Sequence, residues 1–303
     1  MNLKPITPKD YPRLKRFFER QAYRLCEYSL PLIIVWSNDE YQPYGAIDDE
    51  SLIIAAEFAT QKENRHLILP ISPVKEHTPE ELCELAVKFG FESFWFVPEE
   101  YINTYGKKRI NACFSVTEQK GFNDYVYRTD DLIALKGNKY AKKRNLIHQF
   151  ERNYISNGHV KIEPMNPQVA PECIDFLEEW CEQNHCDADG ELNLACEKQA
   201  ALNAIEHIDR LGVKGLLLRL EDKVSAFGIA SQLTANMGVL HFEKADANIK
   251  GLYQYFDNQC ALQLLNRYEY INKESDMNMP GLAKAKKSYH PAMIIKSYVL
   301  TLK

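Results

Sequence analysis

The sequence has no apolar run that approaches the roughly 18 to 20 residues of a membrane-spanning helix. Its first residues, MNLKPITPKDYPRL, contain a lysine but no apolar segment behind it of the kind that a secretory signal carries. These two absences argue against a membrane span and against export. We therefore expect a soluble protein without an integral membrane segment, located in the cytoplasm.

Several catalytic motifs are also missing. The 303 residues contain no G-x-S-x-G turn, no Walker loop, no H-E-x-x-H pair and no dinucleotide-binding glycine fingerprint. These motifs are typical of serine hydrolases, nucleoside triphosphatases, zinc proteases and NAD enzymes. Their absence disfavours all four classes.

The eight cysteines show no spacing typical of a disulfide framework. Most fall in apolar segments, which favours reduced thiols in a protein core. The densest group is Cys181, His185, Cys186 and Cys196, which is the one set that could hold zinc. Its spacing fits no established ligand pattern, so no metal site is predicted.

What the chain does have is ample apolar content, 45%, and a length above that of a usual single domain. Helices, three strands, a helix and a strand are predicted in the first half and again in the second. We therefore expect an α/β (α+β) protein built from a duplicated unit, with mixed sheets flanked by helices.

The predicted elements follow from apolar periodicity and from cap residues. Helices are predicted over residues 7–27, 78–90, 170–184, 197–212, 252–267 and 280–289. Strands are predicted over residues 30–37, 44–58 with an internal turn, 66–72, 91–97, on both sides of a turn at 120–121, and over 213–221, 224–233, 239–245, 268–275 and 293–302.

One concentration of candidate residues lies at 239–256, where a strand leads through the loop DANIKG into a helix. Free N–H groups at a helix start suit a phosphate or an oxyanion, and Lys244, Lys250 and Gly251 are the candidates to contact it. Strand alternation places His241 and Glu243 on one face. A strand with one polar edge and a routine turn is the competing interpretation.

A second concentration lies at 270–291. Alternation places Asn272, Glu274 and Asp276 on one face of a strand, at the carboxyl end where α/β proteins bind ligands. Further candidates follow at Lys284, Lys286 and Tyr289. Mutually neutralising surface charge is the alternative, but such polarity between core-like strands favours a substrate site.

The third is a basic stretch at 135–152, LKGNKYAKKRNLIHQFER, in a chain whose net charge is -5. Residues 172–198, by contrast, hold nine acids and one lysine. This separation of charge favours an anionic partner such as RNA, a phosphorylated cofactor or an acidic lipid headgroup. A solvated helix face is the ordinary alternative. The candidate contacts are Gly137, Lys142, Lys143, Arg144 and Asn145.

The segments LKGNKYAKKRNLIHQF, HFEKADANIKGLYQ and YINKESDMNMPGLAKAKKSYHP resemble signature blocks of an uncharacterised bacterial family related to the C-terminal domain of phosphatidylglycerol lysyltransferase. The resemblance covers nearly the whole chain. It implies two tandem GNAT-like (Gcn5-related N-acetyltransferase) domains, akin to the FemABX transferases that use aminoacyl-tRNA. On this sequence they would span residues 1–130 and 131–303, with the active site in the second. The GNAT phosphate cradle Q/R-x-x-G-x-G/A is reduced here to Gly251.

The resemblance implies an acyl-group transferase. Its co-substrate would be aminoacyl-tRNA or acyl-CoA, with no firmly bound cofactor, and its acceptor an amine or hydroxyl of a small molecule or peptide. Glu243 and Asp276 would act as base or bind the acceptor, and Glu274 would hold a cationic aminoacyl group. The other substrate contacts would be His241, Asn272, Lys284, Lys286 and Tyr289. Two alternatives stay open: an acyl-CoA-dependent N-acyltransferase, and a non-catalytic module of the same fold that binds RNA or another anion.

Overall fold

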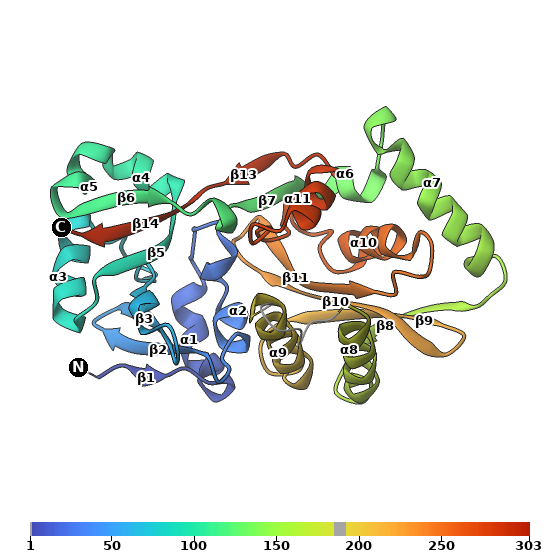
Figure 1. The fold of residues 1–303 in the computed structure, drawn as a ribbon, viewed down its shortest axis with the longest axis horizontal. Coiled ribbons are helices and arrows are strands. Elements are labelled where there is room, and N and C mark those ends of the chain that lie inside the picture. Colours follow the sequence, from blue (N-terminus) through green and yellow to red (C-terminus); the bar gives the residue numbers. More distant parts are fainter. Residues whose placement is uncertain (1, 185–191) are drawn as a thin grey trace.

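The computed structural model describes the backbone of residues 2–184 and 192–303, and the side chains of residues 2–184 and 197–303. Two seven-stranded sheets, each with one parallel and five antiparallel pairings, lie side by side with helices packed against them (Figure 1). The expected α/β architecture of mixed sheets flanked by helices is confirmed.

The first sheet has the strand order β1-β2-β3-β4-β5-β14-β6. Its strands are β1 (Lys4–Pro5), β2 (Tyr41–Asp48), β3 (Ser51–Phe58), β4 (His66–Leu67), β5 (Ser93–Pro98), β14 (Ser297–Leu302) and β6 (Phe114–Glu118). The helices of this half are α1 (Tyr11–Phe18), α2 (Leu30–Val35), α3 (Pro79–Phe89), α4 (Glu99–Tyr105) and α5 (Lys107–Cys113), with short turns η1 (Pro8–Asp10), η2 (Cys26–Tyr28), η3 (Lys62–Asn64) and η4 (Lys120–Phe122).

The second sheet has the order β13-β7-β12-β11-β10-β9-β8. Its strands are β13 (Met293–Ile295), β7 (Asp124–Arg128), β12 (Tyr270–Asn272), β11 (Met237–Ala245), β10 (Lys223–Gln232), β9 (Lys214–Leu220) and β8 (Val160–Met165). The helices are α6 (Thr129–Ala134), η5 (Asn138–Tyr140), α7 (Ala141–Phe150), η6 (Glu151–Ile155), α8 (Ala170–Asn184), α9 (Leu192–Glu206), α10 (Leu252–Gln263) and α11 (Pro280–Lys287). Helices α8 and α9 lie on one side of this sheet and α10 on the other (Figure 1).

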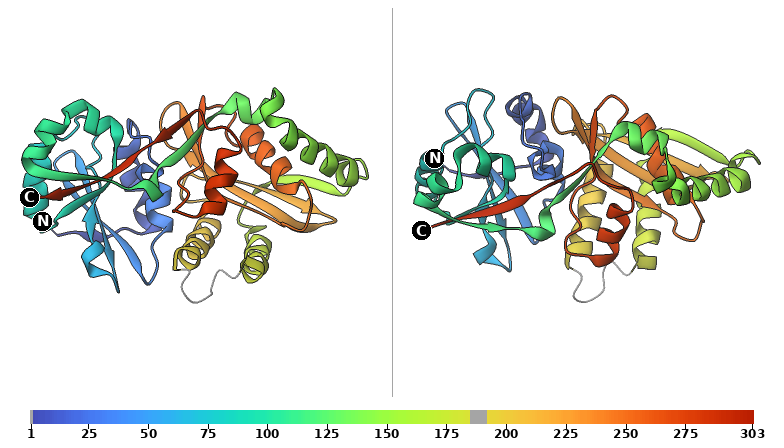
Figure 2. Two further views of the ribbon diagram at one scale, coloured as in Figure 1. Left: turned by 45° about the horizontal axis from the view of Figure 1, so that its top comes forward. Right: turned by 90° about the horizontal axis from the view of Figure 1, so that it is seen from above.

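The two sheets repeat one pattern. Counted from β1 and from β8, each has three antiparallel pairings, one parallel pairing (β4 with β5, β11 with β12) and two more antiparallel pairings. The sixth strand of each sheet comes from the other part of the chain: β14 joins the first sheet and β7 the second (Figure 2). The repeated element order is therefore confirmed. A domain boundary at residues 130 and 131 stays a prediction, and the sheets exchange one strand each across it.

Local signals set several elements. Thr78 accepts a hydrogen bond from the backbone N–H of Glu81, whose side chain bonds back to Thr78, and Pro79 occupies the first turn of α3. Gly90 ends this helix with φ of 73°, in the left-handed region that favours glycine. The prediction of this helix and of both its ends is confirmed.

Some predicted elements are wrong. Residues 30–37, predicted as a strand, form α2 instead, because Leu30–Val35 is buried on every side and an evenly apolar run carries no periodicity. The predicted helix over 7–27 ends at Phe18. The predicted single strand over 293–302 is two strands, β13 and β14, that belong to different sheets.

Two hydrophobic cores sandwich the second sheet. Phe227 and Ile229 on β10 belong to a core shared with the first half and with α8 and α9. Ala226 and Ala230 on the same strand belong to a second core beneath α7 and α10. The two halves are thus joined through a continuous apolar core. Within residues 2–184 and 192–303, no helix has the length and apolar character needed to cross a bilayer.

Candidate functional site

Polar side chains gather where β11 and β12 separate. These strands pair in parallel at three positions, the last of which is Val239 opposite Asn272. Strand β11 continues to Ala245, whereas β12 ends at Asn272. The place where neighbouring strands part, at their carboxyl ends, is where open α/β sheets hold ligand groups.

A β-bulge sets the directions of side chains on β11. The pairing of β10 with β11 shifts after Ile229, which leaves His241 as an extra residue on β11. Glu243 pairs with Gly228, whose Cβ position faces α10, whereas His241 contacts Ser231 on the other side of the sheet. The prediction that His241 and Glu243 share a face is therefore wrong, because the bulge interrupts the alternation.

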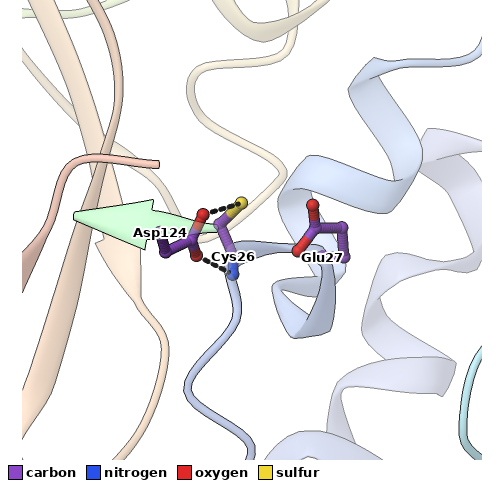
Figure 3. Close-up of side chains that lie close together, drawn as sticks. All are labelled: Cys26, Glu27 and Asp124. Carbon is purple, nitrogen blue, oxygen red and sulfur yellow. Dashed lines mark hydrogen bonds between the residues drawn. The ribbon is translucent and has the colours of Figure 1, made fainter. Parts of the chain in front are cut away.

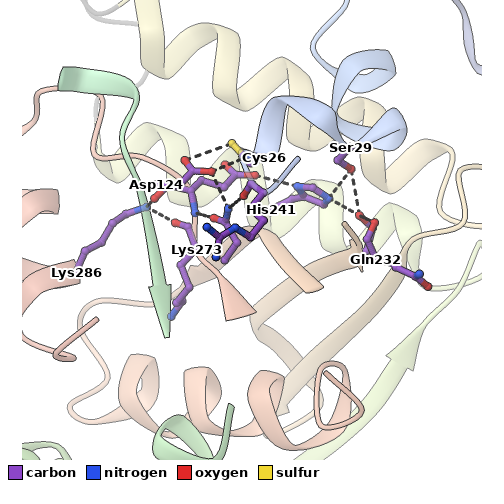
Figure 4. A network of polar contacts seen from close by, with 11 residues as sticks. Cys26, Ser29, Asp124, Gln232, His241, Lys273 and Lys286 are labelled. Carbon is purple, nitrogen blue, oxygen red and sulfur yellow. Dashed lines mark hydrogen bonds and ion pairs between the residues drawn. The ribbon is translucent and has the colours of Figure 1, made fainter. Parts of the chain in front are cut away.

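His241 connects the two halves of the molecule (Figure 4). Its Nε2 lies 2.7 Å from Ser231 Oγ and 3.3 Å from Ser29 Oγ, and its Nδ1 lies 2.9 Å from Glu274 Oε1. Ser29 immediately precedes α2 in the first half, whereas Ser231 is the next-to-last residue of β10 in the second. His241 and both serines are buried.

Asp124, at the start of β7, is the buried acid at the centre of this contact. One of its oxygens accepts hydrogen bonds of 2.7 Å from the Cys26 backbone N–H and of 2.7 Å from the Asn272 amide. The Cys26 thiol lies 3.6 Å from the other oxygen (Figure 3). Burial raises the pKa of Asp124 to about 6, although the bonds from Asn272 and Cys26 act in the opposite direction.

Glu27 stands beside Cys26 and Asp124 (Figure 3). Its Oε2 is buried and has no hydrogen-bond partner among the residues that the structure describes. One ligand atom from each of these three residues lies within 4.8 Å of the others, a spacing that a metal ion could bridge. Burial raises the pKa of all three groups.

Lys273 links Glu243 to the buried Asp257 on the α10 side of the sheet. Its Nζ lies 3.2 Å from Glu243 Oε2 and also donates to Asp257 on α10. Burial raises the pKa of Glu243 to about 7, against the opposing influence of Lys273. Burial lowers the pKa of Lys273, but the two carboxylates more than compensate and keep it raised. Glu243 is thus a carboxyl group that changes charge near neutral pH.

The basic stretch meets this charge cluster through α11. Lys143 Nζ donates a 2.7 Å hydrogen bond to Ser288 Oγ and lies 3.7 Å from the centre of the Tyr289 ring. The Tyr140 hydroxyl donates to the Tyr289 carbonyl at 3.0 Å. The same Tyr289 ring is 5.3 Å from Lys273 Nζ. The predicted approach of the basic stretch to residues 270–291 is confirmed.

Several cations remain on the outside of this junction. Lys142 on α7 and Lys287 at the end of α11 are exposed, and their chain neighbours Lys143 and Ser288 are hydrogen-bonded to each other. Lys139, Lys142, Lys143 and Lys287 are hereafter the basic face. Asn145 on α7 and Lys284 on α11 are also exposed.

Arg144 forms hydrogen bonds to the backbone just before α7. Its guanidinium donates to the carbonyl of Leu135 and, at 2.8 Å, to that of Gly137. Gly137 has φ of 87° and begins the turn η5 that precedes α7. Both residues therefore shape the entry into α7.

The turn at Gly251 has a packing role. A Cβ there would lie 2.2 Å from the carbonyl oxygen of Leu146 on α7, so the close approach of this turn to α7 requires glycine. The adjacent Lys250 is exposed. The basic stretch therefore contacts both the turn at Gly251 and residues 270–291, whereas a cavity shared by all three stays a prediction.

Lys244 already has partners. It is buried, its Nζ lies 2.7 Å from Glu197 on α9, and it stands 4.2 Å from the centre of the Trp180 ring on α8. Its charge is thus neutralised on the α8–α9 side of the sheet, away from the turn at Gly251.

The residues after β12 do not continue as a strand. Glu274 has φ of 60°, in the left-handed region, and Asp276 accepts a 2.6 Å hydrogen bond from the Tyr125 hydroxyl. The prediction that Asn272, Glu274 and Asp276 share one strand face is therefore wrong, because β12 ends at Asn272. Glu243 and Asp276, predicted together as catalytic, have different partners.

Lys286 fills the space behind this loop. Its Nζ donates to the carbonyl of Lys273 and, at 3.2 Å, to that of Glu274. Burial lowers its pKa, against the influence of Glu274 and Asp124. Lys286 thus holds the loop that presents Glu274 to His241.

The residues of this site that were not predicted from the sequence include Ser29, Asp124, Ser231, Asp257 and Lys273. Each is a polar residue inside or beside an apolar segment, and a buried polar residue in a core position is the signal that could have found them. Of the possible zinc set, His185 and Cys186 lie outside the described residues, as does the side chain of Cys196.

Comparisons with known proteins agree with this fold. Residues 26–301 match the family described as phosphatidylglycerol lysyltransferase, C-terminal. A conserved protein of unknown function from Bacteroides thetaiotaomicron is 28% identical, with a TM-score of 0.88 over 100% of both chains. The C-terminal domain of a protein assigned as a lysylphosphatidylglycerol synthetase from Agrobacterium fabrum shares the fold, with 14% identity and a TM-score of 0.65 over 97% of this chain and 92% of that one.

A curated relative adds a sequence match of limited extent. An uncharacterised protein of Mycoplasmoides gallisepticum is 26% identical over 180 residues, which is 58% of this chain and 55% of that protein. The chain thus matches about half the length of this relative.

Proposed function

This chain belongs to the phosphatidylglycerol lysyltransferase C-terminal family, and from that premise we propose that it is an acyl-group transferase that carries an aminoacyl group from aminoacyl-tRNA to an amine or hydroxyl acceptor. The acceptor would be a small molecule or a peptide, and the reaction would take place in the cytoplasm. The observation that supports this proposal most directly is the Glu243–Lys273–Asp257 cluster, which shares the Tyr289 ring with Lys143 of the basic face.

The basic face would bind the donor. Lys142 and Lys287 are exposed beside Lys143, and an RNA backbone presents regularly spaced phosphates to such cations. Lys250, exposed next to the turn at Gly251, would add a further phosphate contact. Binding through these residues would weaken as salt rises, because each phosphate contact releases a condensed counterion.

The carboxyl groups would handle the acceptor. An amine is protonated at neutral pH and must lose a proton before it can attack the ester carbonyl of the donor. Glu243, with a pKa of about 7, can take that proton under these conditions. Asp276 and Glu274, on the loop after β12, would hold the acceptor or the ammonium group of the aminoacyl donor.

The direct test is a transfer assay with the purified chain. Radiolabelled aminoacyl-tRNAs would be supplied as donors together with a panel of amine and hydroxyl acceptors. We expect label to move from tRNA to an acceptor, and we expect ribonuclease treatment of the donor to abolish this transfer. Transfer from acyl-CoA but not from aminoacyl-tRNA would show that aminoacyl-tRNA is the wrong donor and would favour an acyl-CoA-dependent N-acyltransferase.

A thermal-shift measurement would separate binding from turnover. A ligand that binds only the folded chain raises its melting temperature. A shift with charged tRNA, combined with no transfer to any acceptor, would contradict the enzymatic proposal and favour an RNA-binding module.

A further inference from the structure

Cys83 on α3 and Cys113 at the end of α5 form a pair of thiols in the first half of the molecule. A side-chain hydrogen bond joins Cys113 to Cys83. Both residues are partly exposed, whereas the other cysteines whose side chains the structure describes are buried. Among the described cysteines, the two that an oxidant in solution can reach are therefore the two that contact each other.

A neighbouring ion pair shows how the two helices bring these residues together. Arg109 on α5 donates hydrogen bonds of 2.9 and 2.7 Å to the two carboxylate oxygens of Glu80 on α3. Cys83 follows Glu80 by three residues and Cys113 follows Arg109 by four, so the cysteines lie about one helical turn further along the facing sides of the same helices. The contact between the thiols is thus set by the packing of α3 against α5.

From this arrangement we propose that Cys83 and Cys113 are a redox-active pair that a peroxide converts to a reversible disulfide. The disulfide joins α3 to the start of β6, because Phe114, the first residue of β6, directly follows Cys113. The backbone N–H of Lys303, just after β14, donates to the Cys113 carbonyl at 3.1 Å, so the same bond also fastens the end of β14. Both helices lie far from α10 (Figure 1), and the inference goes beyond the transfer reaction and does not depend on it.

The oxidation balances with hydrogen peroxide as the oxidant. One thiol, as its thiolate, attacks a peroxide oxygen, the O–O bond breaks, and a sulfenic acid and water form. The second thiol attacks the sulfenic sulfur, the S–O bond breaks, and the S–S bond forms as a second water leaves. The two thiols together lose two electrons and two protons. Glutathione reverses the reaction through a mixed disulfide, and a second glutathione then leaves with the first as oxidised glutathione.

Contact between the thiols, and not unusual acidity, makes the disulfide the product. Burial raises the pKa of the Cys113 thiol, and Cys83 adds to this in the same direction. A lone thiol of this kind reacts slowly with peroxide, and its sulfenic acid can be oxidised further to a sulfinic acid. A second thiol already in contact captures the sulfenic acid first. Disulfides of this transient kind are the ones found in reducing compartments such as the cytoplasm.

The test is a thiol map of the whole chain. Reduced protein would be treated with hydrogen peroxide and alkylated in denaturant, and its peptides would be mapped by mass spectrometry before and after dithiothreitol. We expect two peptides joined through Cys83 and Cys113 that dithiothreitol separates. The buried Cys26, Cys173 and Cys260 are internal controls that should be recovered as alkylated thiols. Absence of the joined peptides, or sulfinic acid at either residue in their place, would overturn the inference.

Variants separate the disulfide from other effects of peroxide. Oxidation should raise the melting temperature of the wild type by about 5 °C or more, because the cross-link encloses residues 84–112, with β5 and α4, and restricts the unfolded chain. Cys83→Ser and Cys113→Ser should each lose the joined peptides and this gain. Ser115→Ala, an exposed position on β6, is the matched control and should keep both.

Two outcomes of the melting experiment would contradict the proposal. An equal gain in Cys83→Ser would mean that peroxide acts at another site. A disulfide between Cys83 and Cys113 without any gain in the wild type would contradict the fastening of α3 to β6. If a serine variant does not fold, the thiol map of the wild-type chain decides the question, and none of these results depends on acyl transfer.

Discussion

The side-chain amide of Asn272 donates hydrogen bonds to the Asp124 carboxylate at 2.7 Å and to the Arg24 carbonyl at 2.9 Å. Its oxygen accepts a third, of 2.6 Å, from the backbone N–H of Glu274. One fully buried side chain thereby ties the loop before α2 to β7 and to the loop after β12. This contact holds the two halves together close to the loop whose Glu274 bonds to His241.

Removal of this amide should destabilise the protein. In Asn272→Ala the buried Asp124 loses a donor and two backbone groups lose their partners, which should lower the free energy of unfolding by about 3 kcal/mol. Chemical denaturation followed by circular dichroism would measure the change. Asn157→Ala, at an exposed position, should stay within about 0.5 kcal/mol of the wild type. Equal stability of the two variants would contradict this account of the junction.

Glu243→Gln should reduce acyl transfer by about 100-fold or more, because glutamine cannot accept a proton. In the wild type, transfer should rise with pH as Glu243 deprotonates near its raised pKa of about 7. Initial rates between pH 5.5 and 8.5 would show this rise, and the variant should lack it. Glu221→Gln, which changes an exposed acid, should behave like the wild type. A variant with the wild-type profile would remove Glu243 from the mechanism.

The basic face should control the salt dependence of tRNA binding. Each lysine that contacts a phosphate adds somewhat less than one unit to the slope of log K against log salt. Lys142→Ala and Lys287→Ala should therefore each weaken binding and reduce this slope by about one unit. Fluorescence anisotropy with labelled tRNA at several salt concentrations would measure both. Lys62→Ala, in the first half, is the control and should leave the slope and the affinity for tRNA unchanged. If Lys62→Ala lowers the affinity as much as Lys142→Ala does, tRNA binds non-specifically and not through the basic face.

Acid should destabilise the protein through His66. Burial lowers the pKa of this fully buried histidine to about 4, below the 6.5 of an exposed one, so the unfolded chain binds more protons between these values. The stabilisation is complete above pH 6.5 and is lost as the pH falls toward 4, for a change of about 3 kcal/mol. In His66→Phe, which preserves an aromatic ring against Trp95, this loss should be absent.

The wild type must be compared with His66→Phe because groups other than His66 also titrate between neutral pH and pH 4. Burial raises the pKa of Asp124 and Glu243. Because the folded chain then binds more protons than the unfolded chain, these two acids make the protein less stable as the pH rises. The difference in unfolding free energy between wild type and His66→Phe isolates the histidine. A difference that does not change between pH 7 and pH 4 would contradict the prediction.

Elements with local signals could be predicted from the sequence. Helix α3 carries its start at Thr78 and its end at Gly90, so neither depends on the rest of the fold. Helix α2 could not be recognised, because its environment is apolar on all sides and only the tertiary structure decides between helix and strand.

Some features of the candidate site could likewise be predicted from the sequence, whereas others depend on the tertiary structure. The three polar blocks could be found because their charges are concentrated in the sequence, and they do meet in space. The bulge at His241 could not be found, since it depends on how β10 and β11 pair. Ser29 could not be found either, because it is 202 residues from Ser231 and only the packing of the two halves brings their hydroxyls together.

The exchange of β7 and β14 affects the order in which the strands can assemble while the chain is synthesised. A ribosome releases β1 to β6 before β14, so β5 and β6 can be joined only after Ser297–Leu302 has been synthesised. Until then both strands have an open edge that another chain could occupy. Residues 297–302 therefore complete a sheet whose other strands were synthesised earlier.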